Sequence, residues 1–314
     1  AKPGKPAPAA KPAAKPAPAA KPAPAAKPAV AAKPAAAAKP AAAVKPAAAA
    51  GKPAKGKKQA GRVVWHDLMT TDVEKARAFY TALFPWKTRP VELQPLGVTQ
   101  RIESGGKEVG GLVSLPSSEG IASHWMPYVL VSNLDAVVSR AKELGGFAPV
   151  PPTNLDKMGR FAVIADPRGA HVSPIEATGN QPAAGMPQVG QVAWNEVLSD
   201  DPESSARFFA DVFGWNLKTQ DMGGMTYTLF LDPAFADGDM AGQRGGCWRA
   251  PEGVTPSWLS YWSVNDVDKA FEKAKSLGAQ ANMPPTDIPG VGRSATLIDP
   301  TGAAFALFSA PKTP

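Results

Sequence analysis

Residues 65–80, WHDLMTTDVEKARAFY, return later in the chain as WNEVLSDDPESSARFF at residues 194–209. Each stretch begins with tryptophan, carries an aspartate seven residues later and ends in two aromatic residues. Matched positions then continue in the same order as far as the Asp-Pro pairs at 166–167 and 299–300. This conserved order indicates a tandem duplication, with copies at 61–180 and 187–311 and a linker at 181–186.

Within each copy, the hydrophobic pattern predicts one strand, one helix and three strands, and then the same series again. The stretch VVWHDLM alternates as a strand does, and Asp72 is placed to cap a helix whose apolar residues share one face. The second series begins with the strand YVLV at 128–131 and the helix Asn133 to Leu144, which Gly145 ends. Further short strands are expected near 98–103, 108–115, 147–150, 160–165 and 170–176.

This order resembles a known superfamily. Two βαβββ units per copy, with D..KA..FY in the first helix, N.D.....A..LGG in the second and a final DP.GA turn, resemble the vicinal oxygen chelate superfamily, and most of all its glyoxalase/bleomycin resistance protein/dioxygenase type. The resemblance covers both copies. It implies an α+β fold of tandem domains, each with two βαβββ units that form a half-open, curled, mixed β-sheet with the helices outside.

The resemblance also implies three positions per copy for metal ligands, usually His, Gln or Glu. These positions fall on Trp65, Ser173 and near Met126 in the first copy, and on Trp194, Ala306 and near Leu259 in the second. None of these side chains replaces the donors that a divalent ion needs. We therefore expect no metal and no cofactor.

His66 follows Trp65 directly. Because neighbouring strand residues face opposite sides, we expect His66 to point away from the cavity and to be a surface or helix-packing residue. A shift of strand register would instead bring it into a metal site with His124 and His171 in the first copy. That site is the alternative to the metal-free prediction.

The same alternation places Asp67 beside Trp65, and Glu196 beside Trp194, on the cavity face. An aromatic platform next to a carboxylate suits an organic cation, or a ring that bears hydrogen-bond donors. The alternative is a core tryptophan beside an acid that pairs internally with Arg160 in the first copy or its counterpart in the second.

Further candidates come from the later strands of each copy. Tyr128 and Tyr261 share the cavity face by alternation and are placed to orient a ligand, although packing is the alternative. Arg160 and Arg293 each follow a glycine at a strand start, where an arginine grips an anionic group or satisfies a nearby acid. The expected ligand-binding residues are therefore Trp65, Asp67, Tyr128, Arg160, Ser173, Trp194, Glu196, Tyr261 and Arg293.

Residues 1–58 differ in composition from the rest of the chain. They are almost entirely Ala, Pro and Lys, and they contain 13 of the 34 Lys and Arg residues but no acid. Such a segment buries too little apolar surface to fold, so we predict a disordered basic tail. A mobile polycation attracts nucleic acid or another polyanion, and a solubilising spacer is the alternative.

These features favour a protein that binds or sequesters a small organic molecule in metal-free, tryptophan-lined cavities. The alternatives are a metal-independent enzyme with Asp67 or Glu196 as general base, a metal-dependent lyase or dioxygenase, and an interaction module tethered to a polyanion. The chain shows no apolar run of membrane-spanning length and a single cysteine, which is typical of a cytoplasmic protein. Duplication favours a monomer whose two domains pair internally.

Overall fold

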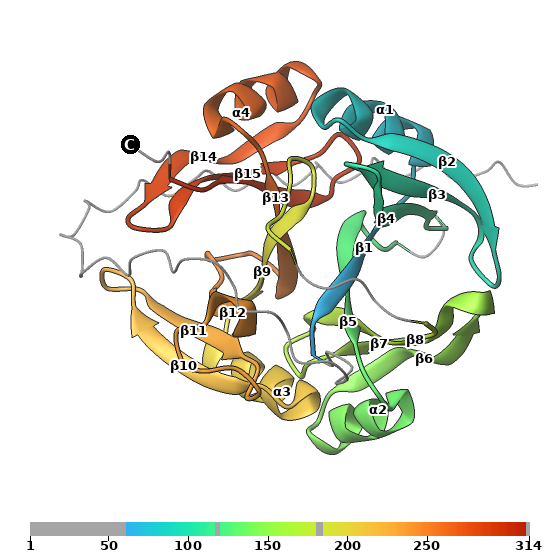
Figure 1. The fold of residues 1–314 in the computed structure, drawn as a ribbon, viewed down its shortest axis with the longest axis vertical. Coiled ribbons are helices and arrows are strands. Elements are labelled where there is room, and N and C mark those ends of the chain that lie inside the picture. Colours follow the sequence, from blue (N-terminus) through green and yellow to red (C-terminus); the bar gives the residue numbers. More distant parts are fainter. Residues whose placement is uncertain (1–60, 117–119, 180–184, 312–314) are drawn as a thin grey trace, which may run out of the picture. The chain divides into compact units, whose positions relative to one another are not determined.

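The computed structural model describes residues 61–116, 120–179 and 185–311, which form two eight-stranded sheets, one from each copy (Figure 1). The predicted tail, 1–58, and most of the linker, 181–186, lie outside the described residues. The elements of the first copy are β1 (Val63–Thr70), α1 (Val73–Leu83), β2 (Lys87–Leu93), β3 (Gly97–Ser104), β4 (Lys107–Ser114), β5 (His124–Leu130), α2 (Leu134–Glu143), β6 (Phe147–Leu155), β7 (Gly159–Ala165) and β8 (His171–Ala177).

The second copy repeats this series. Its elements are β9 (Val192–Ser199), α3 (Pro202–Phe213), β10 (Asn216–Asp221), β11 (Thr226–Leu231), β12 (Gln243–Arg249), β13 (Ser257–Ser263), α4 (Val267–Ser276), β14 (Gln280–Ile288), β15 (Gly292–Ile298) and β16 (Ala304–Ser309). Short 3₁₀ turns, η2 (Asp156–Met158) and η3 (Met240–Gly242), precede β7 and β12.

Both sheets have the same mixed topology. The strand order is β2-β3-β4-β1-β5-β8-β7-β6 in the first and β10-β11-β12-β9-β13-β16-β15-β14 in the second. In the first sheet, β1 is parallel to β4 and β5 is parallel to β8, whereas β1 and β5 are antiparallel. The predicted α+β fold of paired βαβββ units in curled, mixed sheets is therefore confirmed.

The helices begin where the sequence predicts. Asp72 caps α1 by accepting a hydrogen bond from the backbone N–H of Lys75 at 2.9 Å, and Asn133 caps α2 in the same way. The buried face of α1 consists of Ala76, Phe79, Tyr80 and Leu83, as its spacing predicts. Every helix in the described part of the chain is too short or too polar to cross a bilayer.

Each sheet has two buried faces with different neighbours. Side chains on the helix-covered faces form two cores, and each core joins half of one copy to half of the other. The first combines residues such as Phe79 and Trp86 with Trp262 and Phe305, and α1 lies beside α4 (Figure 1). The second combines the remaining halves and places α2 beside α3. The opposite, inner face of each sheet is left for a separate cluster of side chains.

Candidate functional site

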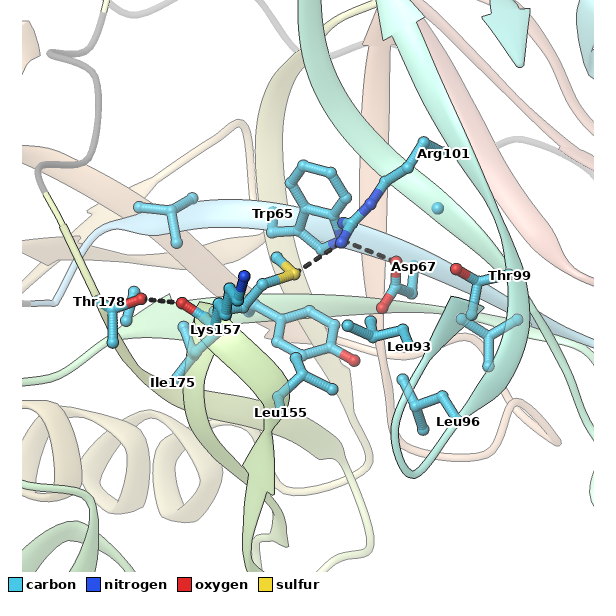
Figure 2. A pocket seen from close by; sticks show the side chains of 16 residues that line it. Trp65, Asp67, Leu93, Leu96, Thr99, Arg101, Leu155, Lys157, Ile175 and Thr178 are labelled. Carbon is cyan, nitrogen blue, oxygen red and sulfur yellow. Dashed lines mark hydrogen bonds between the residues drawn. The ribbon is translucent and has the colours of Figure 1, made fainter. Parts of the chain in front are cut away.

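The inner face of the first sheet lines a partly open cavity of about 210 Å³ (Figure 2). One wall is polar and aromatic: β1 supplies Trp65 and Asp67, β3 supplies Arg101, and β5 supplies Tyr128. The rest is mostly apolar and includes Leu93, Leu96, Val113, Leu155, Met158 and Ile175. A largely apolar space with a few polar groups on one wall is typical of a small-molecule site.

Asp67 is the acidic group of this cavity. It is 6% exposed, and its Oδ1 accepts a hydrogen bond from Trp65 Nε1 at 2.7 Å. The Tyr128 hydroxyl also hydrogen-bonds to it, and the positive charge of Arg101 lies nearby. Burial nevertheless raises the pKa of Asp67, because loss of water outweighs the two hydrogen bonds and the arginine. A carboxyl in this state retains its proton to higher pH than an exposed one.

The position on β4 that faces Asp67 requires a glycine. Gly111 on β4 pairs with Asp67 in register, and a Cβ atom at Gly111 would lie 2.5 Å from Asp67 Oδ1. A side chain there would displace the carboxyl. The Gly-Gly sequence at 110–111 therefore makes room for the acid.

Arg101 lies opposite Gly111 on the other neighbouring strand. It is 7% exposed, and its guanidinium lies over the Trp65 ring, 4.7 Å from the ring centroid. One nitrogen contacts the Met158 sulfur. None of the ion pairs between described residues includes Arg101. The cavity thus contains a buried cation that no carboxylate of the described chain pairs within salt-bridge distance.

The second copy fills the corresponding place with its own side chains. Glu196 pairs with Gly246 as Asp67 pairs with Gly111. Its carboxylate accepts hydrogen bonds from Trp248 Nε1 at 2.7 Å, from the Tyr261 hydroxyl at 2.5 Å and from the Tyr227 hydroxyl at 3.0 Å. Trp194 Nε1 donates to the same Tyr227 oxygen at 2.7 Å. Burial raises the pKa of Glu196 against these three hydrogen bonds.

The strand registers identify what differs between the copies. Arg101 lies opposite Gly111, and Leu229 lies opposite Gly246, so leucine occupies the arginine position in the second copy. Two residues before the Leu229 and Arg101 positions, the second copy has Tyr227 and the first has Thr99. Two residues after the paired glycines, the second copy has Trp248 and the first has Val113. Two large aromatic residues replace two small ones, and they lie against the buried carboxylate.

The predicted site residues fall into two groups. Trp65, Asp67 and Tyr128 line the cavity of the first copy, and Trp194, Glu196 and Tyr261 lie together in the second. Ser173 is fully buried on β8, opposite Tyr128, and its hydroxyl donates to the Ala162 carbonyl at 2.9 Å.

The structure separates Arg160 and Arg293 from these sites. Arg160 forms two hydrogen bonds to Asp135 at 2.9 and 3.0 Å, and Arg293 binds Asp268 in the same manner. Both acids lie in the first turn of a helix, α2 or α4, on the exposed side. Asp67 is therefore not paired with Arg160 either; its partners are Trp65 and Tyr128.

The three histidines lie apart from the cavity. His66 points away from it as expected, but it is not a surface residue: it is 6% exposed, and its Nε2 lies 2.8 Å from Asn195 Oδ1 in the other copy. His124 bonds to the Ala122 carbonyl, and His171 contacts the Phe147 ring. Across the described ranges, His, Cys, Asp and Glu form no group of three that could hold a metal ion.

The residues at the positions that the resemblance implies for metal ligands do not fit a divalent ion. Trp65 presents an N–H donor that is already bonded to Asp67, and Met126 is an apolar residue of the inner cluster. Ser173 offers only a neutral hydroxyl, which donates to the Ala162 carbonyl. Asp67 alone offers an anionic oxygen, and one carboxylate is too few for the ligand sets that hold such ions.

Arg101, Tyr227 and Trp248 were not identified as site residues from the sequence. Their positions depend on how β3 pairs with β4 and β11 pairs with β12. A usable signal exists in the Gly-Gly pairs at 110–111 and 245–246, because a strand residue opposite such a pair lies beside the carboxyl. The copies differ there, with arginine in one and leucine in the other.

Comparison with known proteins agrees with the fold. The model of the Glyoxalase/Bleomycin resistance protein/Dioxygenase superfamily matches residues 188–307. The protein named "Putative glyoxylase CFP32" of Mycobacterium bovis is 33% identical over 261 residues, which are 81% of this chain and 97% of the relative. The anthracycline biosynthesis protein DnrV of Streptomyces peucetius is 30% identical over 264 residues, 79% of this chain and 92% of the relative. The chain belongs to the Glyoxalase/Bleomycin resistance protein/Dioxygenase superfamily.

Solved structures share the fold at much lower identity. The Mn(II)-bound glyoxalase from Novosphingobium aromaticivorans is similar with a TM-score of 0.54 and 14% identity, covering 80% of this chain and 82% of that one. The 2,3-dioxygenase LapB from Pseudomonas sp. KL28 gives a TM-score of 0.53 and 12% identity, covering 80% and 93%. At such identities the likeness concerns the fold alone.

Proposed function

We propose that the protein binds and sequesters a small organic molecule in the cavity of its first copy. The observation that supports this most directly is the partly open cavity of about 210 Å³, with mostly apolar walls and the polar groups of Trp65, Asp67, Arg101 and Tyr128 on one side. A cavity of roughly 150 Å³ accepts benzene, and drug-sized ligands occupy roughly 300 Å³ or more. The ligand is accordingly expected to be about the size of one substituted ring.

The second copy is proposed to act as a scaffold rather than a second site. Tyr227 and Trp248 lie against Glu196, and all three donors on that carboxylate belong to the chain itself. A ligand there would have to displace side chains that already satisfy a buried acid, which is costly. The sequence predicted a tryptophan-lined cavity in each copy, and we propose that only the cavity of the first copy binds a ligand.

The names of the relatives are in keeping with an organic ligand. One is named a glyoxylase, and another is named for anthracycline biosynthesis. Both names refer to the chemistry of small organic molecules, which fits the size and the apolar lining of the cavity.

The matched tryptophans of the two copies provide the test. Single-ring aromatic compounds would be titrated into the full chain by calorimetry, with Trp65→Ala and Trp194→Ala as the paired variants. We expect saturable binding that Trp65→Ala weakens by roughly tenfold or more, because an aromatic wall is lost, and that Trp194→Ala leaves nearly unchanged. Equal losses in both variants, or a loss only in Trp194→Ala, would refute binding at the first copy.

A second candidate function is metal-independent catalysis with Asp67 as general base. The raised pKa of this buried carboxyl favours it, since a stronger base abstracts protons more readily near neutral pH. Asp67→Asn would then abolish turnover of a bound substrate and leave binding within about threefold. Glu196→Gln would keep turnover, because Glu196 is enclosed by its three donors.

Binding of nucleic acid or another polyanion through residues 1–58 is a separate proposal that rests on the 13 lysines of this segment. Because such binding releases counterions, it should weaken steeply as salt rises. Deletion of 1–58 should abolish retention on a polyanion matrix and leave ligand binding by the first copy intact.

A further inference from the structure

We propose that the ligand of the first cavity carries an oxyanion, either a carboxylate or an ionised enol or phenol, and that Arg101 holds it. The proposal rests on the proposed function, because it specifies the chemical class of the molecule that the same cavity binds. It differs from the expectation of an organic cation, which followed from the Trp65 and Asp67 pair alone.

The first argument is the state of Arg101. The residue is 7% exposed, it belongs to the cavity wall, and no ion pair among the described residues includes it. Its direct contacts are a ring face and a thioether sulfur, which are weak partners for a guanidinium, and Asp67 interacts with it electrostatically from beyond ion-pair distance. A buried cation is costly unless an anion meets it. A planar guanidinium fork is suited to the two oxygens of a carboxylate.

The second argument is that the Trp65 ring already has a cation over it. The Arg101 guanidinium lies 4.7 Å from the ring centroid, so it occupies the place of an organic cation stacked on that face. Such a ligand would displace the arginine or meet its like charge at short distance. The aromatic platform therefore orients the arginine of the chain and does not recognise a cation.

The third argument is the balance of charge around the cavity. Arg101 and Lys157 are its basic lining residues, and Asp67 is its acidic one. Asp67 is held by Trp65 and Tyr128, and burial raises its pKa against the opposing charge of Arg101. A ligand anion thus meets two cationic side chains and a carboxyl that gains its proton more easily than usual. The second copy, which has Leu229 in place of Arg101, offers no comparable guanidinium at that register position.

The test compares probes of one shape and three charges. Benzoate, benzamide and benzylammonium would each be titrated by calorimetry into the full chain at neutral pH and moderate salt. We expect benzoate to bind best, by roughly tenfold or more over benzamide, with benzylammonium the weakest. In Arg101→Leu, which introduces the residue of the second copy, benzoate should lose this advantage and bind about as weakly as benzamide.

Two further variants isolate the role of the guanidinium. Arg101→Lys keeps the charge and loses the fork, so its preference for benzoate should be intermediate. Arg89→Leu removes an exposed arginine from β2 that pairs with Glu108, so it should leave the preference unchanged. The basic segment 1–58 is present in every variant, so any nonspecific attraction for anions cancels in the comparison.

The outcomes separate this proposal from the proposed function. Equal binding of benzoate and benzamide to the unmodified chain, tighter binding of benzylammonium, or a benzoate preference that persists in Arg101→Leu would overturn the anion proposal and leave a ligand-binding cavity in place. If Arg101→Leu fails to fold, the comparison of the unmodified chain with Arg101→Lys decides the matter, and an unchanged benzoate preference in Arg101→Lys would then overturn the assignment to the guanidinium. If no probe of any charge binds, including the naphthalene analogues of all three, the proposed function fails as well.

Discussion

The Tyr80 hydroxyl forms a buried hydrogen bond between the two copies. Tyr80 is fully buried on α1; its hydroxyl donates to Asp299 Oδ2 of the second copy at 2.9 Å and accepts from Trp125 Nε1 at 2.9 Å. The corresponding residue of the second copy is Phe209, and Trp258 Nε1, at the Trp125 position, has no hydrogen-bond partner among the described residues. On the other side, Asp166, which matches Asp299, accepts instead from the Ser205 hydroxyl of α3, so the two copies are joined there through a different residue.

Replacement of Tyr80 by phenylalanine should lower the free energy of unfolding by about 2 to 4 kcal/mol, because it leaves a buried indole N–H and a buried carboxylate oxygen with one partner fewer. Urea denaturation followed by circular dichroism would measure this. Thr81→Val is the matched control: it removes a hydroxyl from the next residue of the same helix, where the bond goes only to the Arg77 carbonyl. Equal small effects of both substitutions would show that the Tyr80 contacts contribute little.

At the scale of elements, β1 and β9 meet at equivalent residues. His66 and Asn195 occupy the same position in the two copies, and their side chains contact each other at 2.8 Å. Trp262 approaches the imidazole edge-on, with ring centroids 5.8 Å apart. Burial lowers the pKa of His66 to about 4, and the contact with Asn195 opposes this only in part. The neutral imidazole is therefore part of the native contact between the strands.

This contact predicts a loss of stability in acid. Since the pKa of His66 is lower in the folded than in the unfolded chain, its contribution is complete above pH 6.5 and is lost as the pH falls towards about 4. We expect about 2 to 3 kcal/mol less stability at roughly pH 4.5 than at pH 7 from this residue. Asp67 and Glu196, whose pKa values are raised, act in the opposite direction, so the comparison must be between variants. His66→Gln should remove this part of the acid dependence and His124→Gln should not; parallel curves for His66→Gln and the unmodified chain would contradict the assignment.

The direction in which strand side chains point could be predicted from the sequence for some strands and not for others. The faces of β1 followed from strict alternation, which placed Trp65 and Asp67 inside and His66 outside. Arg160 lies on the helix side of β7, because its neighbour Phe161 belongs to the inner cluster. The sequence alone did not give this face, because it does not show which residues of β7 point inwards. Arg101 could not be placed because its partners lie on other strands and in η2.

For the whole molecule, the duplication makes one copy the partner of the other. Both cores on the helix-covered faces take residues from the two copies, so neither copy buries these faces alone. The second copy retains the fold, and Tyr227 and Trp248 lie against Glu196 at the positions that Thr99 and Val113 occupy in the first copy. This difference between the two inner faces could not be predicted from the repeat itself, because it depends on which side chains meet inside each sheet.

These shared cores predict the assembly of the full chain and of its halves. We propose that the full chain is a monomer of 32.6 kDa, because its pairing surfaces are already covered internally. Residues 61–180 expressed alone would expose the apolar residues of both cores, including Phe79, Trp86 and Val138. We expect this fragment to aggregate or to form homodimers, and to recover a soluble heterodimer when residues 187–311 are co-expressed. Light scattering after size exclusion measures each mass. A stable, folded monomer of 61–180 would show that the cores between the copies are not needed, and a full chain of twice the expected mass would show that a further surface remains to be paired.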